Sequence, residues 1–280
     1  MARILNEKEI EQLGIVTDVL KDFSLQKIYQ IFAGLKNGVD VSIYANTAYD
    51  DEQMQEIRIG LEAGVDVSIY ADPKYSKRQM EQMREGLEAG IDVSIYANRK
   101  YTPDQMSQIR IGLADGIEAS IYADPKYGQD QMWQIREGLE DNLDVLVYVD
   151  PKFSSWQMYE IRIGLKNGVD VTVYADPKYD HNQMREIRKG LQNGVEVSPY
   201  ADPKYDCWQM QIIRLGFEEA LDVSVYANAD FSAEQMIQIY LGLKDGIDVS
   251  VYANSKKDAE QMEIIRRRLE ANAKRNSGRK

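Results

Sequence analysis

The dipeptide Gln-Met recurs every 26 residues, and this spacing constrains the fold more than any other feature of the chain. The glutamines stand at positions 53, 79, 105, 131, 157, 183, 209, 235 and 261, with no insertion or deletion between them. A strict period of this length indicates a repeat array, in which each repeat packs only against its neighbours. A chain of 280 residues would otherwise suggest about two globular domains, but the repeat predicts a single array instead.

Each repeat carries the signals of a short helix. Ser76 is a favourable N-cap residue, and Gln79 three residues later completes a capping box. The apolar residues at positions 2, 5 and 9, counted from each Gln as position 1, lie on one side of such a helix. Gly64 can stop the helix in the left-handed conformation. The inner Gly60 is expected to let adjacent helices approach closely.

A β-strand is expected after each helix. Val65, Val67, Ile69 and Ala71 alternate with polar residues, a period of two that is typical of a strand with one apolar face. Helix–strand repetition with short links requires parallel strands and right-handed crossovers. Helices need more width than strands. The predicted fold is therefore an α/β, right-handed βα solenoid, a horseshoe of nine repeats with a parallel sheet on the concave face and helices on the convex face.

The segment Val67-x-Ile69-x-x-Asp72 resembles the Leu-x-Leu-x-x-Asn core of leucine-rich repeats, whose repeats are 20–29 residues long. The resemblance is one of architecture and partial motif, and it covers residues 27–260. It implies a binding scaffold and no enzymatic activity. The expected organisation is an N-terminal helical cap at 1–26, nine helix–strand repeats at 27–260, and a capping helix with a basic tail at 261–280.

Composition narrows the possible partners. The formal charge is −12 and the isoelectric point is near 4.8, so a polyanion such as nucleic acid is not the expected partner. A single cysteine excludes an intramolecular disulfide, and the chain shows neither a secretory signal nor an apolar run long enough for a membrane span. We expect a cytoplasmic protein with a protein partner, no membrane contact and no cofactor. The composition says nothing of its oligomeric state.

The concave face of the predicted horseshoe would carry rows of acidic, hydroxyl and aromatic side chains. The acidic row includes Asp66, Asp92, Asp144 and Asp170, and the aromatic row includes Tyr70, Tyr96, Tyr122, Tyr148 and Tyr174. One interpretation is a groove that binds a cationic peptide, metal ions or a glycan, with the tyrosines as platforms. The other is structural: the acids accept from backbone N–H groups or pair with the recurring arginine of position 6, such as Arg58.

The outer helix positions vary from repeat to repeat and include the candidate partner-binding residues Trp133, Trp156, Tyr159 and Trp208. Aromatic anchors dominate the energetics of interfaces, although drift on an unconstrained surface gives the same variability. His181 and Cys207 lack a second ligand or base nearby, and no phosphate loop, zinc spacing or nucleophile elbow occurs. The sequence thus predicts no metal site and no catalytic residue, and favours a non-catalytic scaffold for protein–protein interaction.

Overall fold

The structure, a computed structural model, describes residues 20–277, and these residues are helical with no β-strand. The predicted α/β horseshoe and its likeness to leucine-rich repeats are therefore wrong. The α-helices are α3 (Leu25–Asn37), α4 (Asp51–Ala63), α5 (Lys77–Glu88), α6 (Pro103–Ala114), α7 (Gln129–Glu140), α8 (Ser155–Lys166), α9 (His181–Gln192), α10 (Cys207–Glu218), α11 (Ala233–Lys244) and α12 (Ala259–Ser277). The chain forms a helical repeat array.

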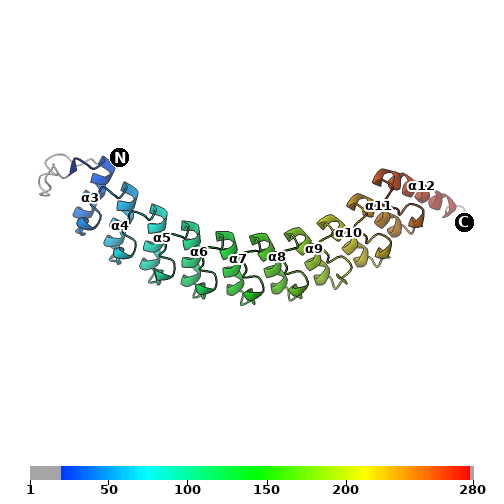
Figure 1. The fold of residues 1–280 in the computed structure, drawn as a ribbon, viewed down its shortest axis with the longest axis horizontal. Helices are drawn as coiled ribbons and strands as arrows, with labels where there is room; N and C mark the ends of the chain where they lie inside the picture. Colours follow the sequence, from blue (N-terminus) through cyan, green and yellow to red (C-terminus); the bar gives the residue numbers. More distant parts are fainter. Residues whose placement is uncertain (1–19, 278–280) are drawn as a thin grey trace. The chain divides into compact units, whose positions relative to one another are not determined.

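A short 3₁₀ helix follows most of the α-helices. These are η1 (Val41–Ile43), η2 (Val67–Ile69), η3 (Val93–Ile95), η4 (Ala119–Ile121), η5 (Val145–Val147), η6 (Val171–Val173), η7 (Val223–Val225) and η8 (Val249–Val251). The chain divides into two compact units, Met1–Arg136 and Glu137–Lys280. Within each unit, successive α-helices pack side by side in the order of the sequence (Figure 1).

The domain boundaries drawn from the sequence, at residues 26 and 260, stay predictions. Most of the expected N-terminal cap, residues 1–19, lies outside the described residues. Within residues 20–277, no helix is both long enough and apolar enough to cross a bilayer.

The predicted helix starts and stops are confirmed. At Ser76 the side chain accepts from the backbone N–H of Gln79, whose own side chain accepts from the N–H of Ser76, so the capping box is complete. Six more α-helices begin with the same reciprocal pair: α4, α6, α8, α9, α10 and α11. Gly64 ends α4 with φ at +75°, a conformation that favours glycine because other residues meet steric strain there.

The segment predicted as a strand instead turns tightly, because its aspartate competes for the backbone. The side chain of Asp66 accepts from the N–H of Ser68 at 3.0 Å and starts the 3₁₀ helix η2. Val67 and Tyr70, three residues apart, are buried, whereas Ile69 is 38 % exposed. The apolar positions therefore follow the period of three of a 3₁₀ helix, which in this short segment is easily mistaken for the alternation of a strand.

The recurring glycine inside each α-helix makes room for the tyrosine of its own repeat. The hydroxyl of Tyr70 lies only 1.9 Å from the point where a Cβ on Gly60 would stand, and it donates to the carbonyl of Glu56 at 3.2 Å. The expected role of Gly60, close approach of adjacent helices, is thus wrong. Because the tyrosine folds back onto its helix, the helix and its 3₁₀ helix form one packed layer.

Neighbouring repeats are joined by side chains that occur in nearly every repeat. The amide of Gln79 donates to the carbonyl of Tyr101 in the next repeat at 2.8 Å, and the hydroxyl of Tyr75 donates to the carbonyl of Ala97 at 3.0 Å. The guanidinium of Arg84 contacts Glu56 of the preceding repeat, with a nitrogen–oxygen distance of 2.9 Å. These contacts satisfy buried polar groups along the seam between repeats, which explains why the same residues recur.

Candidate functional site

The predicted aromatic row is buried and offers no accessible surface. Each of its tyrosines is 0 % exposed: Tyr70, Tyr96, Tyr122, Tyr148 and Tyr174. Burial of the rings also raises the pKa of these phenols, because the phenolate is poorly solvated there. Their recurrence is explained by the packing of each repeat.

The predicted acidic row is exposed, but no sheet carries it. Asp66, Asp92, Asp144 and Asp170 each cap a 3₁₀ helix by accepting from the backbone N–H two residues later. In Asp66 and Asp92 the hydroxyl of the following serine and that same N–H lower the pKa of the carboxyl group. The expectation that these acids bond to backbone N–H groups is confirmed, and this structural role accounts for their recurrence.

The alternative pairing of the acidic row with the arginines of position 6 is wrong. Arg58 donates from Nε to the side-chain oxygen of Gln30 at 2.9 Å, and Arg188 contacts Glu160 at 2.8 Å. In both cases the partner stands at position 4 of the preceding repeat. These arginines therefore join the α-helices of adjacent repeats and not the acids that cap the 3₁₀ helices.

An aromatic cluster lies at the start of α8 and α9 in the second unit, with its tryptophan exposed and its other two rings half-buried. Trp156 is 63 % exposed, and its ring meets that of Tyr159 edge-on, with centroids 6.3 Å apart. On its other side lies the imidazole of His181 in the next repeat, 6.0 Å away between centroids. The guanidinium of Arg162 lies 5.8 Å from the centre of the Tyr159 ring. We call Trp156, Tyr159 and His181 the aromatic cluster.

The same edge continues into the following repeats. Trp208 is 65 % exposed and stands two repeats after Trp156, directly before the Gln of its repeat. Asn182 occupies this position in α9, between them in sequence, and accepts from Arg185 at 2.6 Å. The second unit therefore presents aromatic and amide groups along the N-terminal ends of α8, α9 and α10.

In the first unit the corresponding positions are mainly charged. Arg78 and Asp104 occupy the position of Trp156 in α5 and α6, and they form an exposed ion pair at 2.8 Å. Trp133, the remaining predicted aromatic residue, lies in α7 at the end of the first unit and is 42 % exposed. Of the four outer residues predicted from the sequence, the structure thus brings Trp156 and Tyr159 into contact.

Sequence reasoning assigns no role to His181, because no second ligand or base stands nearby in the sequence. The spacing in the sequence could have indicated its contact with Trp156. Trp156 stands directly before the Gln of its repeat, and His181 stands two residues before the next Gln, 25 residues further on. Residues with this spacing lie at the facing ends of adjacent helices. Cys207 shares this position in α10, but burial and the nearby Asp180 and Asp206 raise the pKa of its thiol. That shift keeps the thiol protonated and unreactive at neutral pH.

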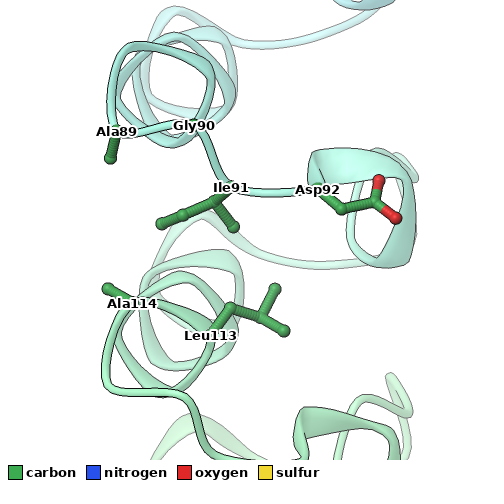
Figure 2. A pocket seen from close by; sticks show the side chains of 6 residues that line it. All are labelled: Ala89, Gly90, Ile91, Asp92, Leu113 and Ala114. Atoms are coloured by element: carbon green, nitrogen blue, oxygen red, sulfur yellow. The ribbon is translucent and has the colours of Figure 1, made fainter.

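A second feature is a groove between the C-terminal ends of α5 and α6, in the first unit. It has a volume of about 480 Å³ and is lined by Ala89, Gly90, Ile91, Asp92, Leu113 and Ala114 (Figure 2). Across residues 20–277, no group of three or more histidine, cysteine or acidic side chains is placed to hold a metal ion. The two surface features are therefore suited to binding through packing and charge.

Comparison with known proteins found no family model that matches the chain, and no curated protein or solved structure that matches it either.

Proposed function

We propose that the chain is a non-catalytic scaffold that binds a protein partner through the edge formed by Trp156, Tyr159, His181 and Trp208. The observation that carries this proposal is the exposure of Trp156 and Trp208, at 63 % and 65 %, on helices whose recurring residues are buried. Tryptophan and tyrosine supply large contact areas and are enriched among the residues that dominate interface energies. Fold maintenance requires no such residue here, since other repeats carry Arg78 or Asp104 instead.

The alternative of a groove with stacked tyrosines has no observation in its favour. Tyr70 and its equivalents are buried, and the carboxylates beside them cap their own turns.

Affinity capture tests the proposal. The full chain is immobilised, exposed to an extract of its native source, and compared with the Trp156→Ala/Trp208→Ala variant by quantitative mass spectrometry. Each interface anchor contributes on the order of 2 kcal/mol, so removing one is expected to weaken the binding of a specific partner roughly 30-fold, and removing both should weaken it further.

The matched control is Arg78→Ala/Asp104→Ala, which truncates two exposed side chains at the same helical position in the first unit. This control should capture the same partner as the native chain. Equal capture by the native chain and the tryptophan variant would contradict the proposal, provided that both retain the same melting temperature.

A further inference from the structure

The seam between repeats ends in a pair of side chains at the C-terminal ends of adjacent α-helices. Position 11 of one repeat faces position 10 of the next, and the two are joined by a hydrogen bond or an ion pair at several junctions. The observed pairs are Asn37–Glu62 at 2.9 Å, Asp141–Lys166 at 2.7 Å, Asn193–Glu218 at 2.7 Å and Glu219–Lys244 at 2.6 Å. At these junctions a pair of polar side chains bridges the ends of the two helices.

The α5–α6 junction lacks such a pair. Its two positions are held by Ala89 and Ala114, and among the nine junctions in the sequence it alone has alanine at both. Ile91 and Leu113 line the groove together with these two alanines (Figure 2). The groove thus coincides with the one junction at which both of these positions carry alanine.

The charge around the groove is negative. Asp92 is exposed at one end of it, and the described residues form no salt bridge with this carboxylate. The C-terminal ends of α5 and α6 also face the groove, and helix C-termini carry partial negative charge. The arginines at position 6 of α5 and α6 are already engaged, Arg84 with Glu88 at 2.8 Å and Arg110 with Glu85 at 3.0 Å. No basic residue lines the groove.

From this arrangement we infer that the groove receives a long basic side chain, arginine or lysine, presented by a partner protein. Its aliphatic stem packs against Ala89, Ala114 and Leu113, while its charged head reaches Asp92 and the helix carbonyls. A purely aliphatic side chain leaves the acid and the helix ends without a counter-charge, and an acidic one is repelled. The chemistry of the lining therefore selects a group that is apolar along its length and cationic at its tip.

This inference is independent of the aromatic cluster. The groove lies in the first unit, whereas Trp156, Tyr159, His181 and Trp208 lie in the second. The groove is tested with small probes of defined chemistry. The groove inference can therefore fail while the proposed scaffold function stands, and the scaffold function can fail while the groove inference stands.

The probes are N-acetyl-arginine methylamide and its uncharged match, N-acetyl-norleucine methylamide, titrated into the full chain with methyl resonances followed by NMR. We expect saturable shifts at the methyl groups of Ala89, Leu113 and Ala114 with the arginine probe, and weaker binding of the norleucine probe. The Asp92→Asn variant keeps an acceptor for the N–H of Ser94 but removes the charge. It should bind the arginine probe about two- to fivefold more weakly, the range of an exposed charge pair.

The second variant, Ala89→Asn/Ala114→Gln, fills the groove without changing its charge and copies the residues of the α8–α9 junction, Asn167 and Gln192. Asparagine suits the site, because Ala89 has φ −82° and ψ 0°, close to the φ −88° and ψ 5° of Asn193 in the equivalent cap. Binding should be lost in this variant. It should persist in the control Ala63→Asn, which adds the same side chain at the α4–α5 junction.

Three outcomes would overturn the inference: no saturable shift of the native chain at millimolar probe, equal affinity for the two probes, or undiminished binding by the filled variant. Unchanged melting temperatures of the variants establish that any loss comes from the groove itself.

Discussion

Helix α8 has a buried side and an outer edge that obey opposite rules. On the buried side, Gly164 and Met158 have the same identity in nearly every repeat, and both are buried. On the outer edge, other residue types replace Trp156 and Tyr159 in most repeats, and glutamate, glutamine, arginine and aspartate are among them. In this helix, recurrence therefore marks the residues that packing requires, while the exposed residues of the outer edge vary from repeat to repeat.

The reason is geometric. A buried position has one set of neighbours, repeated every 26 residues, and accepts few side chains without strain. A Cβ on Gly164 would lie 1.9 Å from the hydroxyl of Tyr174, while Trp156, beside the rings of Tyr159 and His181, is 63 % exposed. The following experiments challenge this division, in order of decreasing expected effect.

Alkaline pH should disrupt the buried side throughout the array. Burial raises the pKa of Tyr122 to about 12, whereas an unfolded tyrosine titrates near pH 10. Below pH 10 the stabilisation is complete. Between these values the unfolded chain loses a proton that the folded chain retains, so the free energy of unfolding falls by about 1.4 kcal/mol per pH unit for each such tyrosine.

Urea unfolding followed by circular dichroism at about pH 9 and about pH 11 measures this loss. The Tyr122→Phe variant should show a shallower dependence than the native chain. Stability that does not change over this range would contradict the burial of the tyrosine row.

Gly164→Ala is expected to destabilise the second unit by about 3 kcal/mol, because the new methyl group overlaps the hydroxyl of Tyr174. The direction is diagnostic, since alanine inside an ordinary helix is about 1 kcal/mol better than glycine. Chemical denaturation measures the change. Adding Tyr174→Phe removes the overlapping oxygen and should restore part of the loss, and a stabilising effect of Gly164→Ala would refute the assigned packing.

Gln157→Ala should cost about 1–2 kcal/mol, because it removes both the capping contact to the N–H of Ser154 and the bond to the carbonyl of Tyr179 in the next repeat. Thermal unfolding monitored by calorimetry provides the measurement. The control is Gln129→Ala, an exposed glutamine at the start of α7, which should leave the melting temperature almost unchanged. Similar losses in the two variants would mean that the bridge adds nothing.

Trp156→Ala should change the free energy of unfolding by less than about 0.5 kcal/mol, the usual range for exposed positions. Equilibrium denaturation is again the measurement. A loss comparable with that of Gly164→Ala would place Trp156 among the residues that maintain the fold, and would remove the basis for assigning it to a partner.

Much of the local structure could be predicted from the sequence. The capping boxes at Ser76 and its equivalents and the left-handed glycine at Gly64 are local chemistry, so their residue types suffice. The strand prediction failed because Val67 and Tyr70 are three residues apart within a segment that also alternates. Pro199 argued against a strand in its repeat, since proline cannot donate a hydrogen bond inside a sheet. The neighbouring Tyr200 is fully buried, as its equivalents are in the other repeats.

The candidate sites show the same division. Exposed tryptophans were predictable, because their positions vary among repeats and lie outside the apolar stripe. The partner of Trp156 was not predicted, since His181 belongs to a different helix. The groove at Ala89 and Ala114 was not predicted either, because it depends on two adjacent repeats that both lack a long side chain at this junction.

By itself the sequence determined that this chain is an array of 26-residue repeats, where the helices of the repeats begin and end, and which positions are free to vary. Those properties depend on contacts within a few residues and on the repetition itself. Only the tertiary structure decided that the tyrosines turn inward onto their own glycines, that the segments after the helices form 3₁₀ turns, and which side chains of neighbouring repeats meet. After each helix, the backbone could either form a turn that its own aspartate caps or pair as a strand with the next repeat. Packing between the layers decides which of the two forms.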